Sequence, residues 1–149
     1  MPTRDLFAAG LKVLGKSKVS ISSATTTNFD FGTPDDINLA TVTAGAPGVN
    51  FEHEDRILVV FSAVETAGST GTDTVSFSVQ DAPDSSGSIG TPATAVTDGT
   101  LTGGTASQYA YTAVRVQPGR PWIRCRVTST GTTNTFVAAC QVFALPYGM

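Results

Sequence analysis

The stretch that most constrains the fold runs from Arg120 to Pro146, where two β-rich segments flank a short connector of Thr, Gly and Asn residues. Residues 121–129 and 134–145 are rich in β-branched and aromatic side chains and are bounded by turn-forming residues. That pattern is typical of a β-hairpin. We therefore predict that these two segments form neighbouring strands and that the rest of the chain packs around them.

Side-chain alternation assigns the two faces of each of these strands, because successive side chains of a strand point to opposite faces. The first segment has one apolar face and one face that carries arginines: Ile123, Cys125 and Val127 against Trp122, Arg124, Arg126 and Thr128. The second segment is apolar on nearly both faces: Phe136, Ala138, Cys140 and Val142 against Val137, Ala139, Gln141 and Phe143. We therefore place residues 134–145 centrally in a sheet, with the arginine-bearing strand beside them.

The remainder of the chain reads as further short strands separated by loops rich in small residues. Strand patterns cover residues 17–25, 37–43, 56–65, 73–81, 92–97 and 108–116. A Gly/Ser/Thr turn joins 56–65 to 73–81, which predicts a second hairpin. About eight strands at this spacing are typical of an antiparallel β-sandwich or barrel. We predict an all-β sandwich.

The first sixteen residues differ from everything that follows. Leu6, Phe7, Leu11 and Leu14 are spaced to suit one face of a short helix. A helix of this length is marginal alone in water. Two interpretations stand: a terminal segment packed on its own domain, or an arm that orders on a partner. The predicted organisation is an N-terminal arm or helix over residues 1–16 and a β-sandwich domain over residues 17–149.

Composition limits the classes of partner. A chain of 149 residues suits one domain that needs no disulfide or metal to fold. Charged residues make up 14% and the net charge is −3, without a dense basic cluster, so we expect no nucleic-acid partner. No apolar run approaches the length of a membrane span, and residues 6–14 lack a secretory cleavage pattern. We expect a protein made in a cytoplasm, with no membrane partner.

The two cysteines, Cys125 and Cys140, both fall within apolar strand patterns. One interpretation is two buried free thiols that act as small hydrophobic residues. The other is a cross-strand disulfide, since neighbouring strands bring Cα atoms within reach of one another. The sequence leaves both open.

No set of residues predicts catalysis or ligand chemistry. His53 is the sole histidine and lies among carboxylates in a loop, without a nucleophile to pair with it. The loop aspartates, which lack calcium-loop spacing, suit the capping of turns: Asp30, Asp35, Asp36, Asp81 and Asp84. We predict that the chain is not an enzyme and has no catalytic, cofactor-binding or metal-binding residues.

Three aromatic residues suggest a different kind of site. Trp122, Tyr109 and Tyr111 are candidates for a platform that stacks against sugar rings, and structural packing in the sheets is the competing interpretation. A carbohydrate-binding or adhesin-type module is therefore the alternative function.

Two blocks of the sequence resemble the Bbp16-like family of phage capsid cement proteins, over roughly residues 20–145. The first block contains Val75, Phe77, Val79 and Asp84. The second contains Trp122, Arg124, Val127, Thr128, Gly131, Phe136 and Val142. The segment from Asn28 to Gly32 resembles the family's Asp-Leu-Gly element, with Asp30, Phe31 and Gly32 in its place. Residues 1–16 have no counterpart, and Cys140 stands where small residues are usual.

The resemblance implies a jelly-roll-like β-sandwich that decorates the outside of a phage head, after synthesis in the cytoplasm of a bacterial host. It implies a homo-oligomer, either a dimer or a trimer, that ties neighbouring major capsid proteins together. An arm that reaches the shell is compatible with this function. Its candidate capsid-binding residues are Arg4, Leu6, Phe7 and Leu11.

Overall fold

The computed structural model describes residues 12–22, 24–32, 36–39, 56–67, 73–102, 108–115, 117, 119–130 and 135–144. The elements in these ranges are β-strands: β1 (Lys12–Ser22), β2 (Thr26–Asn28), β3 (Ile37–Asn38), β4 (Arg56–Ala67), β5 (Thr74–Ala82), β6 (Asp84–Ser85), β7 (Ser88–Ile89), β8 (Ala93–Thr102), β9 (Gln108–Arg115), β10 (Trp122–Ser129) and β11 (Thr135–Ala144). No helix in the described residues has the length and apolarity required to span a membrane.

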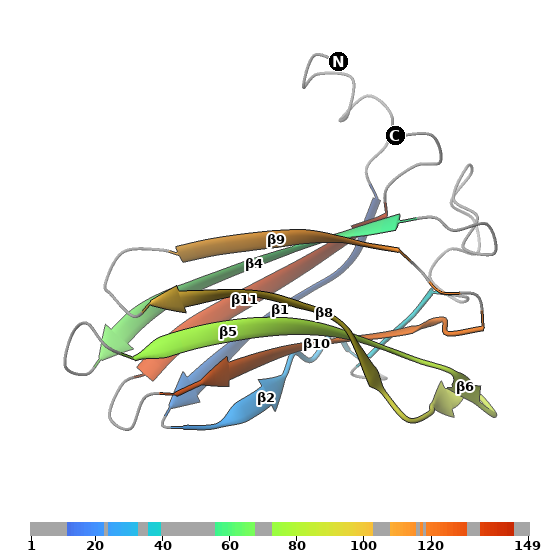
Figure 1. The fold of residues 1–149 in the computed structure, drawn as a ribbon, viewed down its shortest axis with the longest axis horizontal. Helices are drawn as coiled ribbons and strands as arrows, with labels where there is room; N and C mark the ends of the chain where they lie inside the picture. Colours follow the sequence, from blue (N-terminus) through green and yellow to red (C-terminus); the bar gives the residue numbers. More distant parts are fainter. Residues whose placement is uncertain are drawn as a thin grey trace, which may run out of the picture.

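The strands form two antiparallel sheets that pack face to face (Figure 1). Sheet A has the order β1-β11-β4-β9, and sheet B has the order β2-β10-β5-β8, with β3 pairing to the other end of β10. Along the series β1, β2, β4, β5, β8, β9, β10 and β11, successive strands alternate between the sheets, except that β5 and β8 are neighbours in sheet B. This strand order is that of a jelly roll. The predicted jelly-roll-like sandwich is confirmed.

Both predicted hairpins are wrong. β10 pairs with β2, β3 and β5 in sheet B, whereas β11 pairs with β1 and β4 in sheet A. Likewise, β4 and β5 lie in different sheets. A short turn-rich connector has the same local sequence whether the chain turns within a sheet or crosses the ~10 Å between two sheets. The crossing buries an apolar face of each segment in the core. The predicted central position of residues 134–145 is nevertheless confirmed, because β11 lies between β1 and β4.

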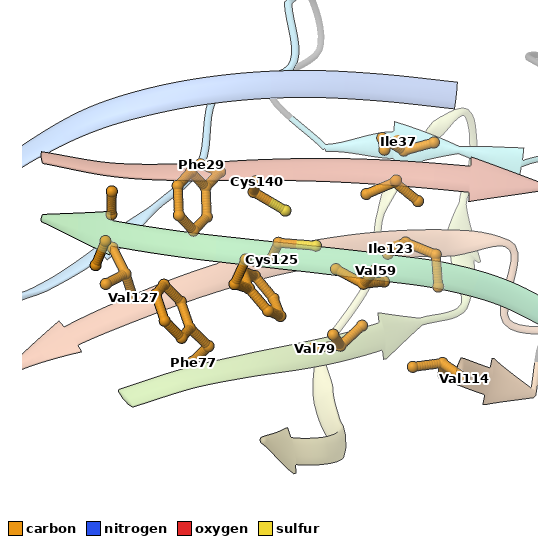
Figure 2. Packing of buried hydrophobic residues seen from close by; sticks show 14 of the residues in the cluster. Phe29, Ile37, Val59, Phe77, Val79, Val114, Ile123, Cys125, Val127 and Cys140 are labelled. Atoms are coloured by element: carbon orange, nitrogen blue, oxygen red, sulfur yellow. The ribbon is translucent and has the colours of Figure 1, made fainter. Parts of the chain in front are cut away.

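The inward faces of the two sheets make one hydrophobic core (Figure 2). The ring of Phe61 in β4 stacks on the ring of Phe77 in β5, with centroids 4.5 Å apart, and Phe29 packs against Phe61 at 6.0 Å. The inward residues of β10 and β11 are those that alternation predicted. Burial of each large apolar side chain in this core stabilises the fold by roughly 1.5–3 kcal/mol.

Cys125 and Cys140 meet in this core from opposite sheets (Figure 2). Both are free and buried, which confirms the interpretation as buried thiols. Burial raises the pKa of the Cys140 thiol, and its hydrogen bond to Cys125 raises that pKa further. The Cys140 thiol is therefore protonated in the folded protein and has no thiolate character.

The first strand begins earlier than predicted. β1 starts at Lys12, with a register irregularity between Val13 and Gly15. A Cβ atom at Gly15 would lie 2.8 Å from side-chain carbons of Ile37 and Phe31, so glycine is required for this close approach. Residues 12–16 of the predicted arm therefore belong to sheet A. The remainder of the arm lies outside the described residues, and its separation from the sandwich stays a prediction.

Candidate interaction surfaces

The outward face of sheet B carries arginines on alternate residues of β10, and a buried carboxylate holds one of them in place. Arg124 Nε and Nη2 donate to the two carboxylate oxygens of Asp36, each at 2.8 Å. The Asp36 side chain is 6% exposed and that of Arg124 is 23% exposed. Asp36 reaches this position because Ile37, the next residue, pairs with Ile123 on β10. A two-point pair of this kind is stronger and more directional than a single hydrogen bond.

Similar contacts fix the start of the same strand. Arg120 Nε donates to Asp81 Oδ1 at 2.6 Å, and its Nη2 donates to the Asp81 carbonyl at 2.8 Å. Asp81 and Asp36 therefore pair with arginines, whereas Asp30 caps a turn as predicted by accepting a bond from the Gly32 amide at 2.8 Å. Asp35 lies outside the described residues. The polar groups at this end of sheet B are thus committed to one another.

Trp122 is part of this network and not a sugar platform. It is 2% exposed, and its indole Nε1 donates to Asp84 Oδ1 at 2.8 Å. Asp84 precedes a tight turn in which Ser86 and Gly87 have positive φ, and its other oxygen accepts from the Gly87 amide at 3.0 Å. These two bonds, that from Trp122 first, lower the pKa of Asp84 below its ordinary 3.8. The contact joins the two sequence blocks that carry the family resemblance.

Arg126 differs from its two neighbouring arginines. It lies on the same face of β10, between Asn28 of β2 and Ser78 of β5. Its Nε is buried, without a hydrogen-bond partner in the described part of the chain. Farther along this face the polar contacts are between hydroxyl groups, at 2.9 Å for Thr26 and Thr128. The outward residues described on β5 and β10 are therefore mostly polar.

The outward face of sheet A is of the opposite kind. The cross-strand pairs on the two central strands bring together residues 58, 60, 62 and 64 of β4 and residues 137, 139, 141 and 143 of β11. Apart from Gln141, which is exposed, these side chains are half-buried, and none is charged. The apolar members are Leu58, Val60, Val64, Val137, Ala139 and Phe143. We call this outward surface the sheet A face.

The edges of the sheet A face are more polar and more exposed. On β1, the exposed residues Lys16 and Lys18 pair with Gln141 and Ala139. On β9, Tyr109 pairs with Ser62 and is 69% exposed. Tyr109 and Trp122 therefore lie on different sheets, so they do not form the common aromatic platform considered from the sequence. Nothing is described of the Tyr111 side chain.

The sequence missed one buried charge. Glu65 continues the inward series of β4 and is 5% exposed, and neither carboxylate oxygen has a hydrogen-bond partner among the described residues. Alternation with period two from Ile57 would have placed it inward. The candidate capsid-binding residues Arg4, Leu6, Phe7 and Leu11 lie outside the described residues, as does His53. Capsid binding by the four arm residues stays a prediction.

The chain matches no family model, and it matches no curated protein in sequence. Among solved structures, it is similar to part of the chain of the Clostridium thermocellum xylanase 10B CBM22-1 and GH10 modules complexed with xylohexaose, at 8% identity and a TM-score of 0.48. That match covers 92% of this chain, which spans 29% of the xylanase chain.

Two further structures of similar shape come from different kinds of protein. A carbohydrate-binding module of Cellvibrio mixtus lichenase 5A, in complex with cellotriose, is 9% identical, with a TM-score of 0.39 and 88% of each chain covered. A chain of the cyanophage Pam1 capsid asymmetric unit is 16% identical, with a TM-score of 0.39 and coverage of 92% of this chain and 86% of that chain. At these values the likenesses carry no information on what this chain binds.

Proposed function

We propose that this protein is a structural, non-enzymatic cement protein that binds the outside of a phage head and stabilises the contacts between major capsid proteins. Its partners in this proposal are the major capsid protein and further copies of itself. The sequence resemblance supports the proposal over roughly residues 20–145. The structural observation that supports it is the sheet A face.

The sheet A face has the properties of a surface that another protein covers. Soluble monomers rarely expose large contiguous apolar patches, and such patches commonly mark protein–protein contacts. Sites for small molecules are concave instead. The outward residues 58–64 of β4 and 137–143 of β11 form the centre of a four-stranded sheet surface, and none of them is charged. A broad surface of this chemistry favours a protein partner over a small ligand.

The physical basis of cementing is mass action combined with multivalency. A protein that binds the assembled shell and not its separated subunits stabilises the shell in proportion to how far its concentration exceeds its dissociation constant. An oligomer that bridges several capsid proteins converts its later contacts into intramolecular ones. Individually weak contacts then suffice for stable decoration.

Co-sedimentation of the purified protein with expanded, undecorated heads of its phage tests the proposal. We expect saturable, stoichiometric binding and a rise in the temperature at which the shell disrupts. A folded protein that fails to sediment with such heads contradicts the proposal. In a parallel experiment, removal of residues 2–11 tests the arm, since it leaves β1 intact. If Arg4, Leu6, Phe7 and Leu11 contact the shell, the truncated protein binds it more weakly.

Carbohydrate binding is the second candidate, and the observation that favours it is the exposed ring of Tyr109. Exposed aromatic rings are the usual stacking surface for sugars. This candidate predicts retention on a glycan column that is lost in Tyr109→Ala and unaffected in Trp122→Phe, because Trp122 is buried. The cement proposal predicts that the glycan column retains neither the wild type nor the two variants.

A further inference from the structure

We propose that two copies of this chain pair through the sheet A face, with the β1 edge of one copy over the β9 edge of the other. The two-fold axis lies between the sheet A faces of the two copies and runs parallel to their strands. This names a second copy as the occupant of the surface on which the proposed function rests. It relies on that function only in taking the face to be a protein-binding surface.

The first support is that the chain places apolar residues where its own core does not use them. The inward residues of β4 and β11, such as Phe61 and Cys140, already fill the core. The outward residues Val60, Val64 and Val137 are also apolar, although no described strand lies over them (Figure 1). In the β5 and β10 strands of sheet B, the corresponding outward positions are mostly polar. The difference indicates that the sheet A face is covered in the working state.

The second support is the size of the face. Four strands spaced ~4.8 Å apart and about ten residues long, at ~3.3 Å per residue, present roughly 600 Å². Two copies then bury about 1,200 Å² in total, which reaches the lower end of the range for stable specific interfaces. Two sheets also pack readily face to face at a spacing of ~10 Å. The face is therefore large enough for a reversible dimer without another element.

The third support is a single cross-strand row that complements itself. Lys18 pairs with Ala139, Ala139 with Ser62, and Ser62 with Tyr109, so the row runs from a cation at one edge to an aromatic ring at the other. A two-fold axis along the strands, through the middle of this row, places each Lys18 over the Tyr109 of the second copy. It places the small residues Ser62 and Ala139 over one another. Lysine over an aromatic face is an attractive contact, and the symmetry forms it twice.

The charges select this axis over the alternative. A two-fold axis across the strands would place β1 over β1, which brings Lys16 and Lys18 of both copies to the same edge. Both lysines are exposed and carry like charges, so that arrangement is repulsive. The proposed axis separates the two lysine edges by the width of the sheet.

Sedimentation velocity of the full chain over a range of micromolar concentrations tests the inference, with a matched pair of variants. Ser62→Lys puts a charge at the centre of the sheet A face, and Ser76→Lys puts the same charge on the outward face of β5 in sheet B. We expect the wild type and Ser76→Lys to reach twice the monomer mass of 15.3 kDa, and Ser62→Lys to remain monomeric. Circular dichroism confirms that both variants are folded.

Tyr109→Ala provides a second variant that does not depend on a buried position, because Tyr109 is 69% exposed. We expect it to weaken dimerisation by about fivefold or more, from the loss of two cation–π contacts. A wild type that stays monomeric, a trimeric mass, or equal dimerisation of Ser62→Lys and Ser76→Lys overturns the inference. Dimers that fail to bind heads contradict the cement proposal and leave the inference standing. Monomers that bind heads support the cement proposal and overturn the inference.

Discussion

The two outward faces of the sandwich are built on the same pleated strands but are completed in different ways. On sheet B, Arg124 and Trp122 find their partners within the chain, in Asp36 and Asp84. On sheet A, the outward valines of β4 and β11 have no described element over them. The outward face of sheet B is completed by contacts within the chain, whereas for the sheet A face we propose that a second copy of the chain completes it. Alternation along a strand therefore predicts which residues point outward, but not whether the outward face stays exposed to solvent.

We expect the largest effect on the outward face of sheet B, from Trp122→Ala. This removes a buried ring and its hydrogen bond to Asp84, and we expect a loss of about 3–5 kcal/mol in the free energy of unfolding. Trp122→Phe retains most of the packing and should lose about 1 kcal/mol from the missing indole donor. Urea denaturation measures both. Equal losses for the two variants would show that packing of the ring contributes little.

The next effect compares two arginines on the same face of β10. Arg124→Met leaves Asp36 buried without its partner, and we expect a loss of about 2–4 kcal/mol in unfolding free energy. Arg126→Met removes a guanidinium whose buried Nε has no partner among the described residues, so its effect should lie within about 1 kcal/mol of zero. If the two variants lose equal stability in urea, the ion pair is not what distinguishes these residues.

The faces of individual strands were predictable from the sequence, whereas their partners were not. Cys125 and Val127 of β10, and Cys140 and Val142 of β11, point inward as alternation required. Alternation is a local property, so it survives in any packing arrangement. The assignment of β10 and β11 to different sheets is not local, because the same connector serves a hairpin or a crossing.

The polar contacts of sheet B could not be predicted from the sequence for a related reason. Arg124 and Asp36 are 88 residues apart, and they meet because β3 pairs with the end of β10. The position of Asp36 in a loop predicts turn capping, which is the usual role of a loop aspartate. Strand order decides such pairs, and the sequence alone did not predict strand order.

We expect a smaller effect from a polar substitution on the sheet A face. Val60→Thr keeps a β-branched side chain on a half-buried outward residue of β4, so we expect the monomer to lose less than about 1 kcal/mol. The same change removes apolar area from the proposed interface and should weaken self-association. Denaturation at low concentration and sedimentation at high concentration separate the two quantities. A large loss in the monomer would show that the chain itself covers this face.

The smallest effect concerns pH and the hydrogen bond between Trp122 and Asp84. Folding lowers the pKa of Asp84 below 3.8, so its ionised form stabilises the native state at neutral pH. That contribution is complete above the ordinary carboxyl pKa and is lost as the pH falls through the lowered value. Asp84→Asn keeps an acceptor for the indole without titrating. The difference in melting temperature between wild type and Asp84→Asn should therefore shrink below pH 4, and a constant difference would contradict the assignment.

Hydroxyl-radical footprinting of Tyr109 tests most directly whether the sheet A face is covered in the working state. The reactivity of this exposed ring is compared in dilute protein, in concentrated protein and in protein bound to heads, with each digested peptide followed by mass spectrometry. Our account predicts that Tyr109 is reactive in dilute solution and several-fold protected in the other two states. Equal reactivity in all three states would contradict it, because the ring would then remain open to solvent wherever the protein acts.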